Sequence, residues 1–273
     1  MAGFRELLAV EWDDNAVETF RLNFPDVPVY HGDIGKLSVE ECLNLTGLQP
    51  GQLDVLDGSP PCQGFSTAGK RVLTDPRNSL FREYVRLIEG LQPKVFVMEN
   101  VSGMVKGKMR IVFREIMLAL KATGYTVRCK LLNAMYYEVP QSRERLIWIG
   151  VRPDVGREPG FPGPVGKPKP LRELAPDVVA CRSQAINPWI PSSRACCTLT
   201  KTAFKGLFRT AQGLREPTEA ELKAIGSFPQ EYRFLGKASA WERIGNSVPP
   251  RFMYHIASHI RDTILQSVRT VAG

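Results

Sequence analysis

Short apolar runs alternate with amphipathic stretches through the first 150 residues, and this alternation constrains the fold more than any other feature. The apolar runs have the length of strands and lie at residues 7–10, 27–30, 53–56 and 95–98. The stretches between them have the apolar spacing of helices and lie at about 13–24, from 38 onward, at 78–91 and at 111–123. Two further strands are expected at 125–133 and 145–151, as an antiparallel pair at one edge. The pattern predicts an α/β chain with a parallel, doubly wound, Rossmann-like sheet.

The composition changes after residue 151. Residues 152–170 are rich in proline and glycine, as expected of a linker or hinge. Residues 171–240 contain short elements, among them a helix from Thr218 to Gly226 that starts with a capping-box pattern. A last amphipathic helix is expected from about 250 to 268. We predict a main α/β domain at 1–151, a linker and small second lobe at 152–240, and a segment at 241–273 that returns to the main domain.

Charge and cysteine content narrow the possible partners. Lys and Arg exceed Asp and Glu by 36 to 28, a net charge of +8 that favours a polyanionic partner. No apolar run reaches membrane-spanning length and the start lacks a secretory pattern, so we expect a cytoplasmic protein with no membrane partner. The six cysteines have no regular spacing and form no CxxC pair. This pattern is typical of reduced thiols, and it predicts no metal site.

Two candidate catalytic groups follow apolar strands. Cys62 comes after Pro60 and Pro61, which rigidify the turn at the carboxyl end of the 53–56 strand. Glu99 follows the 95–98 strand, so both residues are expected at the same edge of the sheet, where open α/β sheets bind ligands. A thiol and a carboxylate over one pocket suit covalent catalysis with acid–base assistance. Taken singly, each has a plain alternative: a buried structural cysteine, and a glutamate that caps the next element.

Arginines and a glycine turn complete the set of motifs. Alternation along the 145–151 strand is expected to put Arg143 and Arg145 on one face, toward an anionic or carbonyl-rich ligand. A surface ladder with Glu144 is the alternative. Gly245 and Asn246 permit a sharp turn before the final helix.

The order and spacing of these motifs resemble the bacterial type of the DNA (cytosine-5)-methyltransferase family. The resemblance rests on Pro-Pro-Cys-Gln-Gly-Phe-Ser, Glu-Asn-Val, Gln-x-Arg-x-Arg and Gly-Asn-Ser-Val-Pro-Pro, and spans almost the whole chain. It implies an S-adenosylmethionine-dependent methyltransferase fold with a covalent mechanism on a flipped cytosine of double-stranded DNA. Cys62 is then the nucleophile at C6, Glu99 contacts N3 and Arg145 contacts O2, while Arg143 supports the pocket.

The resemblance also implies residues for the cofactor and for DNA. Glu11 matches the acceptor of the ribose hydroxyls, Trp12 the ring that stacks on adenine, and Asp33 and Ile34 the adenine-edge contacts. The remaining matched cofactor positions are Leu80, Asn246 and Val248. For DNA we expect phosphate contacts from the loop after Cys62 and from the basic stretch 201–215, whose alternative is a solvated loop. The residues concerned are Ser66, Lys70, Arg71, Lys201, Lys205 and Arg209.

The sequence departs from the family at two places. The strand and glycine-rich turn, roughly Phe-x-Gly-x-Gly-Gly, that open the family's fold and cradle the methionine part of the cofactor have no counterpart before Phe4. That strand is normally central, so its neighbours are expected to have unpaired edges unless a second polypeptide supplies it. The target-recognition region, residues 152–193, is also reduced. The alternatives are a truncated or inactive subunit of a split methyltransferase, and an RNA cytosine-C5 methyltransferase.

Overall fold

A computed structural model of the chain describes residues 2–61, 79–107, 109–182, 188–201 and 207–266. Its largest element is a four-stranded sheet with the strand order β3-β4-β6-β5. These strands are β3 (Val55–Gly58), β4 (Val95–Val101), β5 (Thr126–Asn133) and β6 (Glu144–Val151). β3 and β4 are parallel, whereas β6 is antiparallel to both β4 and β5. The expected antiparallel pair at one edge is confirmed, because β5 is the edge strand.

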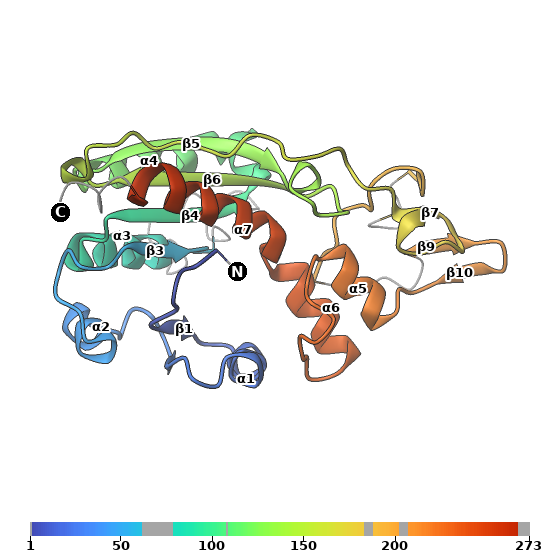
Figure 1. Cartoon of the computed structure of the whole chain (residues 1–273), viewed down its shortest axis with the longest axis horizontal. Coiled ribbons are helices and arrows are strands. Elements are labelled where there is room, and N and C mark those ends of the chain that lie inside the picture. The colour runs from blue at the N-terminus through green and yellow to red at the C-terminus, as the bar shows by residue number, and fades with distance from the viewer. Residues whose placement is uncertain (1, 62–78, 108, 183–187, 202–206, 267–273) are drawn as a thin grey trace.

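Alternation along β4 builds a core on each face of this sheet. Phe96 and Met98 pack toward α3 (Ser79–Leu91) and α4 (Met109–Ala122), whereas Val95 and Val97 pack toward the opposite face. That second face is covered by α7 (Pro250–His259) and the π-helical turn Ile260–Leu265. Figure 1 shows α7 lying across the sheet although it comes from the end of the chain.

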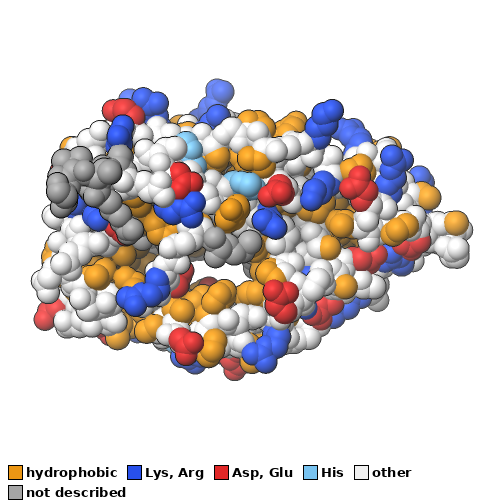
Figure 2. All heavy atoms as spheres, in the orientation of Figure 1, with side chains coloured by type: hydrophobic (Ala, Val, Ile, Leu, Met, Phe, Trp, Pro, Cys, Tyr) orange, Lys and Arg blue, Asp and Glu red, His pale blue; other side chains and the backbone are white. Residues whose placement is uncertain are grey.

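The N-terminal elements form a separate two-stranded sheet. β1 (Ala9–Glu11) and β2 (Val29–His31) are parallel and alternate with α1 (Asp14–Asn23) and α2 (Val39–Thr46). Among the described residues, β1 pairs only with β2, and β3 pairs only with β4. The two sheets therefore do not join, and Figure 2 shows the surface hollowed between the part that contains β1 and α1 and the larger sheet.

The second lobe has its own sheet and core. Its strands are β7 (Val178–Cys181), β8 (Ile190–Pro191), β9 (Phe208–Thr210) and β10 (Gly213–Arg215), in the antiparallel order β10-β9-β7-β8. α5 (Glu219–Ile225) begins with the predicted capping box between Thr218 and Glu221. α6 (Lys237–Asn246) buries Trp241 and Ile244 in the core of this lobe. The 3-10 turns in the described part of the chain are Ser102–Val105, Ala134–Tyr136, Pro153–Val155 and Leu171–Glu173.

The proline- and glycine-rich segment between the two lobes lies along the main sheet (Figure 1). The Tyr137 hydroxyl donates to the carbonyl of Pro162 at 3.0 Å, and the backbone amide of Val165 donates to Tyr136. Gly160 lies so close to the His259 ring that a Cβ would be 2.8 Å from Nε2. Residues 160–165 of the segment are thus held against the turn Ala134–Tyr136 and its next residue, and against the end of α7. No helix of the described residues has the length and apolarity needed to cross a membrane.

Gly150 provides a test of the packing between β4 and β6. A Cβ at this position would overlap the ring of Phe96, which is fully buried between strands and helices. We expect Gly150→Ala to lower the free energy of unfolding by about 1–3 kcal/mol, because the core has no room for another methyl group. Urea denaturation measures this change. Gly163→Ala is the matched control: nothing lies within 4 Å of its added Cβ, so a loss as large as that of Gly150→Ala would contradict the explanation.

Candidate active site

The carboxyl ends of β3 and β4 meet at one edge of the main sheet. Gly58 is the register partner of Met98, so Ser59 and Pro60 emerge beside Glu99 and Asn100. The Asn100 amide donates to the carbonyl of Pro60 at 2.9 Å. Cys62 lies outside the described residues, but the backbone two residues before it is held next to Glu99.

Tyr84 of α3 bridges β3 and β4 near this edge. Its hydroxyl lies within hydrogen-bond distance of the carbonyls of Leu56 (3.1 Å) and Val97 (2.8 Å), one on each strand. A Cβ on Gly58 would be 2.7 Å from the Tyr84 ring, so the glycine permits this close approach. Burial raises the pKa of the Tyr84 hydroxyl well above its ordinary value, which keeps it a neutral donor.

Glu99 and Arg145 form an ion pair at the mouth of the sheet. The Nε of Arg145 is 2.6 Å from Oε1 of Glu99, and both side chains are only 12% exposed. Burial raises the pKa of Glu99 and outweighs Arg145 and a hydrogen bond from Ser59, both of which lower it. Burial also lowers the pKa of Arg145. The pocket therefore favours a carboxyl that holds its proton to higher pH than an exposed glutamate does.

The plain alternatives for these two residues do not hold. The 3-10 turn after β4 has Val101 at its N-cap and no side-chain cap hydrogen bond, so Glu99 does not cap it. Arg145 pairs with Glu99 and touches Glu144 only at its backbone carbonyl, so the two form no surface ladder.

Arg143 lies inside the protein, unlike Arg145. Its side chain is among the largest fully buried ones, and it donates to the carbonyls of Leu199 and Gly245, each at 2.8 Å. Burial, then the charge of Arg145, lower its pKa to about 9. The expectation that both guanidinium groups face a ligand is wrong for Arg143, because protein carbonyls occupy two of its nitrogens. It joins the start of β6, the segment around Leu199 and the end of α6.

The predicted adenosine-side residues gather at the carboxyl ends of β1 and β2. The Oε1 of Glu11 accepts from the backbone amides of Trp12 (2.8 Å) and Asp13 (3.0 Å). The amide of Gly32 donates to the carbonyl of Glu11, which brings the next turn, Asp33 and Ile34, alongside. The Trp12 ring is 79% exposed, so a large aromatic face lies open at this edge.

Side-chain contacts of α3 and α6 connect the elements that carry the remaining predicted cofactor residues to the same edge. Arg86 of α3 donates to the carbonyls of Ile34 (3.0 Å) and Leu37 (2.8 Å), and Leu80 lies in the first turn of that helix. Arg243 of α6 pairs with Asp13 at 2.9 Å. Asn246 is the last residue of α6 and is exposed, whereas Val248 follows the helix and packs against the core of the main sheet.

The predicted DNA contacts are only partly described. Ser66, Lys70, Arg71 and Lys205 lie outside the described residues, whereas Lys201 is exposed and Arg209 is exposed on β9. One further group in the second lobe carries no sequence motif. Trp189 lies against the guanidinium groups of both Arg182 (4.4 Å from the ring centroid) and Arg209 (4.9 Å). In the sequence Trp189 is an isolated aromatic residue in a loop. Arg182 and Arg209 lie on opposite sides of it along the chain, so no local pattern indicates the contact.

Comparisons with known proteins identify the family of the chain. The family model of the C-5 cytosine-specific DNA methylases matches residues 1–174. The Type II methyltransferase M1.HphI of Haemophilus parahaemolyticus is 34% identical over 95% of this chain and 81% of its own length. M.AquIA of Picosynechococcus is 41% identical over 61% of this chain and 70% of its own length.

Solved structures share the fold. A protein described as a prophage-encoded DNA modification methyltransferase of E. coli superposes with a TM-score of 0.72, at 22% identity, over 96% of this chain and 93% of that one. Dnmt2 of S. pombe superposes with a TM-score of 0.65, at 20% identity, over 92% and 89% of the two chains. The fold is thus that of S-adenosylmethionine-dependent methyltransferases. The chain belongs to the C-5 cytosine-specific DNA methylase family, and it is a DNA (cytosine-5-)-methyltransferase that uses S-adenosylmethionine.

Proposed function

We propose that the chain methylates C5 of a flipped cytosine through a covalent bond between Cys62 and C6, with Glu99, Arg143 and Arg145 as the supporting groups. The observation that carries this proposal is the buried Glu99–Arg145 pair at the edge where Asn100 holds the backbone leading to Cys62. A carboxyl, a guanidinium group and a thiol then converge on one base, which must leave the stacked duplex to reach them.

The chemistry needs each of these groups. C5 of cytosine is a weak nucleophile, and addition of the Cys62 thiolate to C6 makes it enamine-like. Electron density moves toward N3, where the carboxyl of Glu99 supplies a hydrogen bond or proton, while Arg145 donates to O2. S-adenosylmethionine supplies the methyl group as an electrophilic sulfonium. Loss of the C5 proton then allows the Cys62 sulfur to leave by β-elimination.

The edge formed by β1 and β2 fits the adenosine part of the cofactor. The two backbone amides bind one oxygen of Glu11, so the second oxygen can accept from the ribose hydroxyls. Trp12 offers an exposed ring for stacking on adenine. We assign Asp33 and Ile34 to the adenine edge, and the surrounding contacts to Leu80, Asn246 and Val248.

For DNA, we propose that the second lobe and the loop after Cys62 contact phosphates. Lys201 and Arg209 are exposed, and the Trp189 ring holds the guanidinium groups of Arg182 and Arg209 close together. Ser66, Lys70, Arg71 and Lys205 are proposed contacts on the strength of the sequence alone. The relatives are bacterial Type II methyltransferases, which favours DNA over RNA, a role in restriction–modification and a place in the cytoplasm.

The division into 1–151, 152–240 and 241–273 also remains a proposal. The burial of α7 against the main sheet supports a returning C-terminal segment. The packing of Trp241 and Ile244 into the second lobe supports a later boundary, after α6.

We further propose that one more strand, from the same or a second polypeptide, pairs with both β1 and β3. Each of these strands has one partner among the described residues, and all three residues of β1 are only half-buried. Central strands of α/β sheets are buried on both faces, as the first four residues of β4 are here. A parallel strand ending in a glycine-rich turn would fill the hollow seen in Figure 2 and cradle the methionine part of the cofactor.

The covalent step is tested with DNA that contains 5-fluorocytosine. Fluorine at C5 blocks the final elimination, so we expect a stable protein–DNA adduct in the presence of tritiated S-adenosylmethionine. The reaction is run with the chain alone and with the proposed additional strand supplied as a separate segment. Cys62→Ser should abolish the adduct on a denaturing gel. An adduct that survives Cys62→Ser would refute the role of Cys62. The absence of any adduct, both with and without the additional strand, would refute the enzymatic proposal.

The role of Glu99 is tested by Glu99→Gln, which keeps the size of the side chain but cannot deliver a carboxyl proton. We expect single-turnover methylation to fall at least about a hundredfold, the usual contribution of a general acid. Because burial raises the pKa of Glu99, the wild-type rate should decline as the pH rises through that raised pKa. The variant should lack this decline. A Glu99→Gln variant with the wild-type rate and pH profile would contradict the assignment.

The strand proposal is tested by hydrogen exchange. Co-expression with the opening strand and glycine-rich turn of a relative should slow exchange of amides in β1 and β3, because their free edges become paired. It should also raise S-adenosylmethionine affinity. The same segment with its glycines replaced by valine is the control. The proposal would be refuted if the added segment changed neither amide exchange in β1 and β3 nor the affinity of the chain for S-adenosylmethionine.

A further inference from the structure

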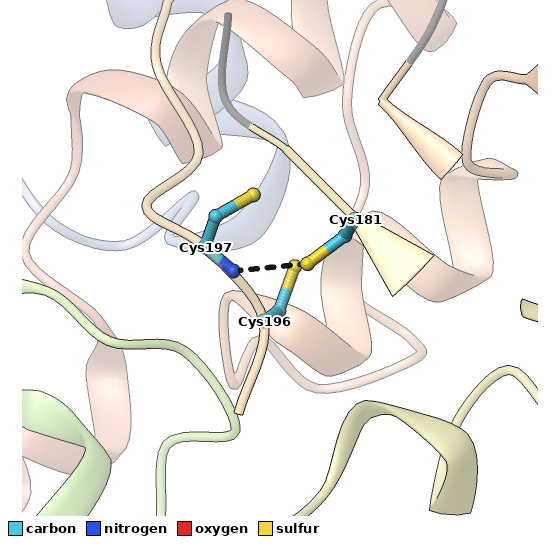
Figure 3. A group of neighbouring side chains, drawn as sticks. All are labelled: Cys181, Cys196 and Cys197. Carbon is cyan, nitrogen blue, oxygen red and sulfur yellow. Dashed lines mark hydrogen bonds between the residues drawn. The ribbon is translucent and has the colours of Figure 1, made fainter. Parts of the chain in front are cut away.

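Three cysteine sulfurs meet in the core of the second lobe. Cys181 is the last residue of β7, whereas Cys196 and Cys197 lie in the segment that leads to Lys201. Their Sγ atoms all lie within 4.8 Å of one another, and the residues are 0%, 0% and 4% exposed. Figure 3 shows the three side chains at the end of β7, with the Cys197 backbone amide donating to Sγ of Cys181 at 3.4 Å.

This cluster differs from ordinary core cysteines. A single buried cysteine acts as a small apolar side chain, as Cys42 does against Leu87 and Leu91. Here three sulfur atoms face one another in one core, and the Cys197 backbone amide donates to Sγ of Cys181. A backbone donor favours the thiolate, which is the form of cysteine that binds metal.

We propose that Cys181, Cys196 and Cys197 form a binding site for one soft cation of low coordination number, of which Cu(I) is the representative. Sulfur atoms that share one metal at bonds of about 2.3 Å lie roughly 4 Å apart, which small side-chain rotations reach from the observed spacing. Thiolates select soft ions such as Cu(I) and Zn(II). The group of ligand atoms found in the described part of the chain has three members, fewer than the four that structural Zn(II) sites take.

Binding involves no change of oxidation state. Cu(I) replaces the protons of the coordinating thiols, which pass to solvent, and copper–sulfur bonds form in their place. Cys181 and the vicinal pair are well separated in sequence, so the spacing of the cysteines predicts no metal site although the fold brings the three together.

The cluster is connected to the active site through the backbone of Cys196. The amide of Cys196 donates to Pro140 at 3.0 Å, and the amide of Ser142 donates to Cys196 at 2.8 Å. Three residues further on, the carbonyl of Leu199 accepts from Arg143. An ion at the cluster would therefore tie β7 to the segment that holds Arg143 in place. This proposal does not depend on the catalytic role of Cys62.

The test is a Cu(I) titration of the reduced chain without oxygen, in competition with the chelator bicinchoninate. The Cys62→Ser background removes the other reactive thiol. We expect one Cu(I) per chain, at least tenfold weaker binding in Cys181→Ser and Cys196→Ser, and an unchanged affinity in Cys129→Ser. X-ray absorption should find three sulfur neighbours, and saturating Cu(I) should raise the Tm, since it binds only the folded form.

Several results would overturn the site. Absence of uptake by the fully reduced protein is one, and an affinity lowered by Cys129→Ser but not by the cluster variants is another. If a serine variant fails to fold, as judged by circular dichroism, Cys197→Ala and the sulfur count on the unaltered cluster decide the question. A first shell with nitrogen or oxygen neighbours would contradict the three-sulfur assignment.

Discussion

The hydrogen bonds of Arg143 hold together the three parts of the chain on which the site depends. A guanidinium group that is buried this completely is costly unless its donors are satisfied, and the carbonyls of Leu199 and Gly245 meet part of that need. Those carbonyls belong to the second-lobe segment and to the end of α6. Both elements therefore assume fixed positions relative to β6. Gly245 is required at this junction because a Cβ there would overlap the backbone of Thr200.

With that junction in place, the proposed base pocket depends on the register of β3 and β4. β3 ends at Gly58, opposite Met98, so the turn before Cys62 emerges beside Glu99, the next residue of β4. β6 runs antiparallel to β4 and delivers Arg145 from the other direction. Burial then adjusts the chemistry, since it raises the pKa of Glu99 although Arg145 is in contact with it. The alternation of side chains that makes β4 a core strand thus also positions Glu99 beside Arg145, as the proposed mechanism requires.

The residues proposed to bind the cofactor lie on a different sheet, and this separation is the main peculiarity of the described structure. Glu11, Trp12 and the turn at Asp33 are arranged by β1 and β2, which share no strand pairing with β3 among the described residues. Contacts through α3 and α6 hold the two sheets near each other instead, by way of Arg86 and Arg243. The proposed base pocket and adenosine edge thus lie on two sheets, and β1 and β3 each have one strand partner among the residues that the structure describes.

The amino-acid sequence by itself determined the elements and the family. The α/β alternation, the antiparallel pair formed by β5 and β6 and the capping box at Thr218 were predictable because they depend on local periodicity and on neighbouring residues. The order of the motifs also predicted that Glu99 and Arg145 lie at one pocket, and the two form an ion pair. Only the tertiary structure decided that Arg143 is a buried clamp, that two arginines lie against Trp189, and that Cys181 meets Cys196 and Cys197. These facts depend on contacts between residues distant in sequence, whose side-chain directions are set by packing, and no local pattern encodes them.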